Sequence, residues 1–482
     1  MNNVILDYLS KLGYTNLHQS YYSYVKLWEE WWKNDVEFHK YKDNFGADRK
    51  MYTLGMAKKI AEDWASNIWS DRDNINTSAD KNKSYVNELI SDFRLSVEIP
   101  KAVETASWSG TCGAIIRVKN GILKKGILMA DDKTTNELIL VSAKQIAPLR
   151  IEHGKIVDVA FASKTMIGKK RVYYIEIHRK KEDGYHITNV YIDRETGQEV
   201  KNDAVLKEYK TDSNVPLFSL LMPPKNNPID DNMGLGFSSY GNALDQLKSV
   251  DIMYHNLVMD FYLGGKKVFY NKKIVGTKPV KVGQDENGED KFEDRPIYPD
   301  DVTKQQWATY GDEMAQFNDD PLVKEYNPDL RVDDDTKGLQ YGLDLLSFKC
   351  DLGAKFYNFN NGSVVTATQY VGDKQDLVQN AKKYRDNLIE FIGGIIKAGL
   401  LLGRLVYHKD VTEECNILIE NVDGFLTDSE TAKKEDMQAL QLGLMSKISY
   451  LMKYRNMTEE QARKELAFID EEKGITSVNL EG

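Results

Sequence analysis

The side chains most often used in catalysis and metal binding are scattered along this chain of 482 residues. The closest pair of histidines, His178 and His186, flanks one expected turn, and we favour two strand histidines that face water over a metal site. The segment from Asp285 to Asp290 offers oxygen ligands in the manner of a cation loop. It lacks the glutamate at the twelfth position of an EF-hand, so a solvated loop is the favoured interpretation.

The motifs of several enzyme classes are missing. The chain contains neither the GxxxxGK[ST] loop of P-loop ATPases nor the HExxH pair of zinc proteases. The three cysteines, Cys112, Cys350 and Cys415, are far apart, so we expect neither a disulfide framework nor a metal site, and a reducing compartment is the simplest setting. A hydrolase or a nucleic-acid-modifying enzyme remains an alternative, with an unrecognised site in the β-rich region 109–222.

Composition and charge limit the partners of this chain. Its hydrophobic content is 41% and its charged content 29%, as in ordinary folded proteins, and its length predicts several subdomains. The net charge of −10 argues against a protein that binds nucleic acid through an overall basic surface, although an acidic chain can let DNA slide past. We expect no signal peptide at the N-terminus. The most apolar segment, 388–407, carries Glu390, Lys397 and Arg404, so we expect a buried or inter-subunit helix rather than a membrane span.

The elements that position these residues are clearest between Gly234 and Asn271. The apolar residues there recur at three- and four-residue spacing and predict one helix from Phe237 to Leu263, followed by a glycine break and the strand Lys266–Asn271. They are Tyr240, Ala243, Leu247, Val250, Tyr254, Leu257, Val258 and Phe261. Such a helix would be about 40 Å long. Because one apolar stripe cannot bury itself, the helix needs neighbours along its whole length.

The rest of the chain alternates between helical and β-rich regions. Residues 1–98 are expected to be helical, including a helix from Tyr85 to Ser96, and residues 109–222 to form an antiparallel meander around the hairpin of Val172–Arg179 and Tyr185–Ile192. Residues 272–335 are expected to form a small α/β module. Further helices are predicted at Thr336–Leu352, between Lys374 and Leu405, and from the capping boxes at Thr427 and Thr458 to about Lys453 and Phe468. The glycines at 393, 394, 399 and 403 indicate a kink or a close helix contact in the long helix.

Three segments in this order resemble the portal proteins of tailed bacteriophages, especially those of phages that infect Gram-positive hosts. They are YTLGMAKKIAEDWASNIWSD (Tyr52–Asp71), the stretch Gly234–Asn271, and NFNNGSVVTATQYVGDKQDLVQNAKKYRDNLIEFIGGIIKAG (Asn358–Gly399). No single motif among them is diagnostic; their joint order and the chain length carry the resemblance. A plain capsid or tail protein without a DNA channel is the other alternative.

The resemblance implies an α+β portal fold in which about twelve subunits form a ring. In this mapping the wing is residues 1–233, the first stem helix 234–263, the clip 264–335, the second stem helix 336–354, the tunnel loop 355–365, a long kinked wing helix with a return strand 366–426, and the helical crown 427–482. The tunnel loop would face DNA through Lys355, Asn358, Asn360, Asn361, Gly362 and Ser363. The stem helices would pack through Leu247, Val250, Tyr254, Val258 and Phe261. The acidic segment of the clip would include Asp285, Glu286, Glu289 and Asp290.

The function implied by the resemblance is mechanical. Such a ring occupies one capsid vertex of the virion, after assembly in the host cytoplasm, and double-stranded DNA is packaged and ejected through it without sequence specificity. Its partners would be further copies of the chain, the terminase, the major capsid and scaffolding proteins, and head-completion or adaptor proteins, with no membrane. We expect no enzyme activity, cofactor or metal in the chain itself, because the terminase would supply the ATPase.

Overall fold

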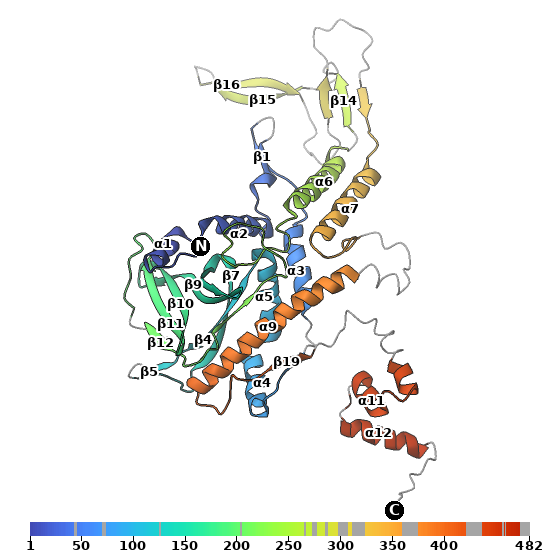
Figure 1. Cartoon of the computed structure of the whole chain (residues 1–482). Helices are drawn as coiled ribbons and strands as arrows, with labels where there is room; N and C mark the ends of the chain where they lie inside the picture. The colour runs from blue at the N-terminus through green and yellow to red at the C-terminus, as the bar shows by residue number, and fades with distance from the viewer. Residues whose placement is uncertain are drawn as a thin grey trace, which may run out of the picture. The chain divides into compact units, whose positions relative to one another are not determined.

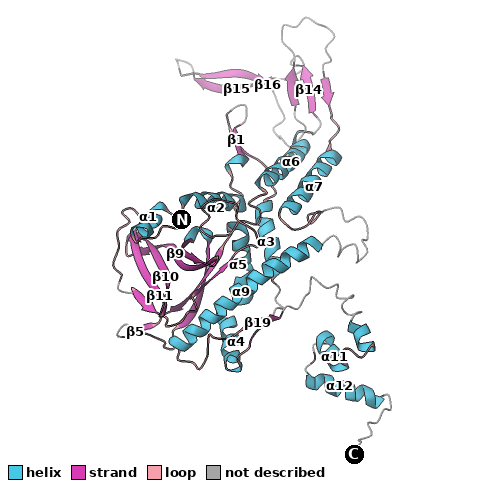
Figure 2. Ribbon diagram, viewed as in Figure 1, coloured by secondary structure: helices cyan, strands magenta, loops and turns pink. Residues whose placement is uncertain are grey.

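The chain adopts a mixed α+β fold, as the sequence predicted (Figures 1 and 2). The computed structural model describes residues 1–482 except 43–45, 70–73, 125–126, 203–204, 265–266, 272–276, 285–287, 297–306, 311–322, 359–374, 421–435, 456, 458 and 473–482. Its contacts divide the chain into two compact units. The first comprises Met1–Gln19, Glu62–Phe237 and Gly362–Gly482, and the second comprises Ser20–Ala61 and Ser238–Asn361.

The first unit is built around a five-stranded antiparallel sheet of order β12-β11-β10-β9-β8. Its strands are β8 (Ile146–Glu152), β9 (Lys155–Ile167), β10 (Lys170–Lys181), β11 (Gly184–Asp193) and β12 (Glu208–Lys210). The predicted hairpin is confirmed, because β10 and β11 pair in register from Val172 opposite Asp193 to Lys181 opposite Gly184. Consecutive strands are also neighbours in this sheet, so the antiparallel meander predicted for residues 109–222 is confirmed for β8–β12. It is wrong for β4 (Cys112–Lys119), β7 (Thr135–Ser142) and β13 (Phe218–Leu221), which form a separate sheet.

Both faces of this sheet are covered. One face is covered by α1 (Asn3–Lys11) (Figure 2). Its Ile5 and Leu9 pack among buried side chains that include Ile175 and Ile177. The other face meets a three-stranded sheet of order β13-β4-β7, formed by Phe218–Leu221, Cys112–Lys119 and Thr135–Ser142. Phe161 of β9 and Phe218 of β13 lie 5.7 Å apart between the two sheets. Burial on both faces explains why the central part of β10, residues 172–178, is buried or half-buried at every position rather than at alternate ones.

Helices and two short strand pairs complete the first unit. The helices are α4 (Lys83–Asp92), α5 (Leu95–Ser109), α9 (Gln375–Leu405), α11 (Lys447–Arg455) and α12 (Glu459–Glu472), together with the last part of α3 (Met56–Ile68). The strand pairs are β5 (Ile122–Lys124) with β6 (Ile127–Met129), and β3 (Asn74–Thr77) with β19 (Ile417–Glu420). No helix in the described part of the chain is long and apolar enough to cross a membrane.

The glycines of α9 mark close contacts. The helix is continuous over 31 residues, and its predicted bounds were correct to one residue. A Cβ at Gly399 would lie 2.8 Å from the side chain of Leu89, and a Cβ at Gly403 would overlap the ring of Tyr85. Both neighbours belong to α4, so these glycines let α4 and α9 approach more closely than alanines would allow.

Alanine substitutions at two of these glycines should have opposite effects. Gly403→Ala should destabilise the protein by about 1–3 kcal/mol, because the new methyl group meets the buried ring of Tyr85. Gly393→Ala is the matched control in the same helix, since its Cβ would lie 3.9 Å from Ile417, an ordinary contact distance. It should stabilise the protein by up to about 1 kcal/mol through helix propensity. Urea unfolding measures both, and equal midpoints for the two variants would contradict the close contact.

In its described part the second unit contains a helical hairpin and three small sheets. Its N-terminal part has α2 (Gln19–Trp32), which begins at the unit boundary, η1 (Glu37–His39) and the strand pair β1 (Lys40–Lys42) and β2 (Asp48–Lys50). The hairpin is α6 (Leu244–Leu263) and α7 (Val332–Lys349). Between them come the sheet β17-β14-β18, formed by Trp307–Tyr310, Lys267–Asn271 and Val323–Tyr326, and the pair β15 (Thr277–Gln284) and β16 (Asp290–Pro296).

Two predicted helices, 237–263 and Tyr85–Ser96, differ from the observed ones. The predicted helix 237–263 starts only at Leu244, because two tight turns precede it: the N–H of Gly241 donates to the carbonyl of Ser238, and that of Ala243 to the carbonyl of Tyr240. At 20 residues α6 is about 30 Å long rather than 40 Å. The predicted helix Tyr85–Ser96 is divided between α4 and α5, since Arg94 takes a left-handed conformation with φ 49°.

The C-terminal helices also differ from the prediction. Residues 436–441 are helical, but the chain then turns through Gly443, whose φ is 73°, before α11 begins. The prediction of one continuous helix up to Lys453 is therefore wrong, because a glycine with positive φ ends the first helical segment. The capping residues Thr427 and Thr458 lie outside the described residues.

Candidate functional site

The α6–α7 hairpin is the most prominent feature of the second unit (Figure 1). The two helices run antiparallel, since the guanidinium of Arg331 just before α7 donates to the carboxylate of Asp260 near the end of α6, at 3.0 Å. Gly342 lets the helices approach, because a Cβ there would lie 2.9 Å from the sulfur of Met253. Each helix is therefore one of the neighbours that the other needs in order to bury its apolar residues.

Burial of the predicted stripe decreases along α6. Leu247 and Val250 are buried, Tyr254 and Val258 are half-buried, and Phe261 is 54% exposed. The next residue, Tyr262, is exposed as well. The stripe is therefore covered within the unit only over the first turns of the helix, and its aromatic end faces solvent.

A second apolar stripe runs along α7. Tyr341, Leu345 and Phe348 are 64%, 42% and 62% exposed, and their spacing of four and three residues places them on one helix face. The opposite face, with Leu343 and Leu346, is buried. Phe261 and Tyr262 lie near the start of α7, where Arg331 binds Asp260, and so at the other end of the hairpin from Phe348. Large exposed apolar side chains on two adjacent helices indicate an interaction surface. We call Phe261, Tyr262, Tyr341, Leu345 and Phe348 the aromatic patch.

The beginning of α6 is held by buried polar contacts. Asp251 accepts a hydrogen bond from the backbone N–H of Leu54 at 3.0 Å, and its other oxygen lies 2.9 Å from Nε2 of His39. Both side chains are buried, and burial raises the pKa of Asp251 against the opposing effect of its two partners. Just before the helix, the hydroxyl of Tyr240 donates to the carbonyl of Trp28 at 2.8 Å. These contacts fix the base of the hairpin.

The predicted tunnel loop is described only in its first part. Lys355 is exposed and has a φ of 67°, and Asn358 is exposed as well. Between them, the carbonyl of Tyr357 accepts a hydrogen bond from the side-chain amide of Gln340 in α7 at 3.0 Å. The chain after α7 is thus tied back onto that helix. The other predicted loop residues, Asn360, Asn361, Gly362 and Ser363, lie outside the described residues.

The predicted acidic segment is likewise described in part. Glu289 and Asp290 are exposed, and Asp290 forms an ion pair with Lys281 on the neighbouring strand β15. Asp285 and Glu286 lie outside the described residues. The first turn of α7 is also acidic, with Asp333, Asp334 and Asp335. Negative side chains at this end stabilise the helix, because the N-terminus is the positive end of the helix dipole.

The histidines on β10 and β11 do not face water, so this expectation was wrong. His178 is fully buried between the rings of Phe161 and Phe218, because the second sheet covers this face of β10. Its Nε2 lies 2.7 Å from the carboxylate of Glu176, which is buried too. His186 is buried and pairs with Asp183 at the turn.

Glu176 is the centre of a buried polar network between the sheets. The guanidinium of Arg117 on β4 lies 2.5 Å from its carboxylate and stacks over the ring of Tyr174, whose hydroxyl donates to Glu176 at 3.1 Å. Burial alone would raise the pKa of Glu176, but His178, Arg117 and Tyr174 together hold it below the usual value. The one local signal for this network is that Glu176 and His178 alternate with Ile175 and Ile177 in the middle of the strand.

These polar groups do not form a recognisable reaction centre. His39 and His178 each bind a carboxylate through Nε2, but Nδ1 of each has no hydrogen-bond partner, so neither ring activates a hydroxyl or thiol as in a triad. Among the described residues, no group of three or more His, Cys, Asp or Glu side chains could hold a metal ion.

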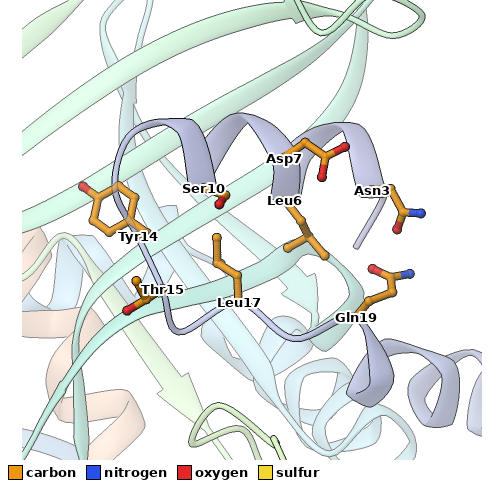
Figure 3. A pocket seen from close by; sticks show the side chains of 8 residues that line it. All are labelled: Asn3, Leu6, Asp7, Ser10, Tyr14, Thr15, Leu17 and Gln19. Carbon is orange, nitrogen blue, oxygen red and sulfur yellow. The ribbon is translucent and has the colours of Figure 1, made fainter.

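One hollow of about 520 Å³ lies beside α1 in the first unit (Figure 3). Asn3, Leu6, Asp7 and Ser10 of the helix line one side, and the following segment supplies the residues of the other side, which are Tyr14, Thr15, Leu17 and Gln19. Asp7 is its one carboxylate, and no histidine, cysteine or lysine lines it. It therefore offers polar groups but no acid–base pair.

Comparison with known proteins finds no family model and no curated protein that matches this chain.

Proposed function

We propose that this chain is the subunit of a ring through which double-stranded DNA passes, in the manner of a phage portal. The observation that carries the proposal is the aromatic patch on the α6–α7 hairpin, which leaves five large apolar side chains uncovered on two antiparallel helices. Further copies of the chain are the natural cover, because a heterologous contact repeated around an axis closes into a ring. In this proposal α6 and α7 are the stem, and the resemblance in sequence supplies the rest of the assignment.

The charges of the chain suit a passage for DNA better than a binding site. With a net charge of −10 the subunit has no overall attraction for phosphates. Lys355 is the one base of the proposed tunnel loop, whose asparagines and serine contact phosphates only weakly and do not distinguish sequences. DNA can therefore move along the loop without being held.

The proposed partners follow from this function. The wing would contact the major capsid and scaffolding proteins at one vertex, and the clip would bind the terminase during packaging and head-completion or adaptor proteins afterwards. The chain would need no cofactor, because the terminase supplies the ATPase. A capsid or tail protein without a channel is the alternative that the aromatic patch would also fit.

Electron microscopy of the purified full-length protein tests the proposal. We expect rings with rotational symmetry of about twelve and an open channel that admits a DNA duplex roughly 20 Å wide. A closed assembly without a channel would favour the capsid or tail alternative. A monomer at micromolar concentration would contradict self-association through the patch, and screening for hydrolase activity would then come next.

The acidic segment of the proposed clip should affect partner binding. Replacing Asp285, Glu286, Glu289 and Asp290 with the corresponding amides removes four negative charges from the proposed clip. We expect weaker binding of terminase or adaptor proteins, or slower DNA packaging, with ring formation unchanged. Pull-down and packaging assays measure this, and wild-type values in all of them would exclude a role for the segment.

A further inference from the structure

The β15–β16 hairpin is exposed on all sides within the described part of the chain. Apart from half-buried Val280, its described side chains between 278 and 295 are exposed, and Phe292 is 59% exposed. Neither strand has another neighbour among the described strands. Because a two-stranded hairpin alone is marginally stable in water, an added strand would stabilise it.

The two outer edges of this hairpin are not equivalent. On β15, Pro279 has no N–H to offer, and the register shifts between Lys281 and Gly283, which is a β-bulge. Proline and bulges are the devices by which natural sheets block an edge. On β16 the residues from Asp290 to Arg295 contain no proline, and the extra residue of the bulge lies on the other strand. The edge of β16 is therefore the one open to another strand.

The side chains of β16 define what an added strand should carry. Phe292 and Asp294 lie on one face, opposite Lys281 and Pro279, and Asp294 has no ion-pair partner among the described residues. Lys291 lies on the other face and is also without an ion-pair partner there. Since residues directly opposite on neighbouring strands interact, an apolar residue fits beside Phe292, a base beside Asp294 and an acid beside Lys291.

We propose that the outer edge of β16 binds an extended segment of a partner protein with this alternation of charges. A second copy of β16 fits less well. Antiparallel pairing of two β16 strands places Glu293, Asp294 or Lys291 opposite itself in three of the registers. In the register with Phe292 opposite itself, Lys291 meets Glu293, but each Asp294 meets Asp290 instead of a base. The blocked edge of β15 excludes pairing of β16 with β15 of a copy. Strand addition to this edge does not depend on ring formation.

Fluorescence anisotropy with the full-length protein tests the proposal. The probe is a fluorescein-labelled peptide with the core Glu-Lys-Lys-Val-Glu, which places these residues opposite Arg295 through Lys291 in antiparallel order. We expect saturable binding, and an affinity at least about tenfold lower for a scrambled peptide of the same composition. Two further peptides carry N-methyl groups on alternate backbone nitrogens, one on the odd positions and one on the even positions. Only one of the two should lose binding, because only every second N–H group of an added strand faces β16.

Two matched proline variants locate the edge. If Pro279 and Asp294 are a non-hydrogen-bonded pair, the N–H groups of Asp294 and Lys281 both point away from the hairpin, on opposite edges. Asp294→Pro should therefore lower the affinity about tenfold, whereas Lys281→Pro should leave it unchanged. Equal effects of the two variants, no saturable binding at about 1 mM peptide, or no effect of methylation would overturn the proposal. Loss of self-association in Asp294→Pro would assign the edge to a second copy and would also overturn it.

Discussion

Replacing Phe348 with glutamate is expected to keep the protein monomeric without unfolding it. The side chain of Phe348 is 62% exposed in the subunit, so the substitution should change the free energy of unfolding of the monomer by no more than about 0.5 kcal/mol. In an assembly that covers the aromatic patch, the same carboxylate would lose its water without gaining a partner, at a cost of several kcal/mol. Because every contact of a ring repeats this cost, assembly should be lost completely. Light scattering coupled to size-exclusion chromatography measures the mass.

A matched control lies on the same helix. Thr336 is exposed and lies five residues before Tyr341, so its side chain is on a different side of α7 from Tyr341, Leu345 and Phe348. Thr336→Glu adds the same charge and should leave the assembly unchanged. If the double variant with Phe348→Glu and Tyr341→Glu assembled like the wild type, the patch would not be the contact between subunits. The proposed ring would then lose its main support.

Elements with strong local patterns could be predicted from sequence almost to the residue. The hairpin of β10 and β11 follows from alternation on both sides of a glycine turn, and α9 from a long run of helical spacing. Helix α7 was predicted four residues late at its start, since a run of three acids separates Val332 from the apolar residues further along the helix. In these segments the local signal and the final packing agree.

Features that depend on distant parts of the chain could not be predicted. His39 and Asp251 are 212 positions apart, and neither has a local signal for its partner. The grouping of Ser20–Ala61 with Ser238–Asn361 in one unit is likewise invisible in local periodicity. The burial of His178 depends on the second sheet, which adds Phe218 from forty residues further along the chain. These features all depend on contacts between residues that are far apart in the sequence.

Removing the carboxylate of Glu176 is expected to destabilise the first unit more than any surface substitution. Glu176→Ala leaves the guanidinium of Arg117 and the ring of His178 between the sheets without their common acceptor. Removing one partner of a buried ion pair lowers the free energy of unfolding by about 3–5 kcal/mol. Urea unfolding measures the loss. The double variant Arg117→Met with Glu176→Met removes both charges and should recover a large part of it, which separates an unpaired charge from a simple cavity.

The pH dependence of stability gives an independent test of the same network. The partners of Glu176 hold its pKa below the usual value, so the folded protein binds this proton less readily than the unfolded chain. Its contribution to the free energy of unfolding is therefore complete above about pH 4.3, the usual pKa of glutamate, and declines as the pH falls through the folded value. Glu176→Gln does not titrate at this position. The difference in free energy of unfolding between the wild type and Glu176→Gln should therefore shrink as the pH falls below about 4, because the wild type loses the contribution of the ionised carboxylate. A constant difference between the two proteins from pH 7 to pH 3 would mean that Glu176 is not held ionised by Arg117 and His178, and that the network acts through shape alone.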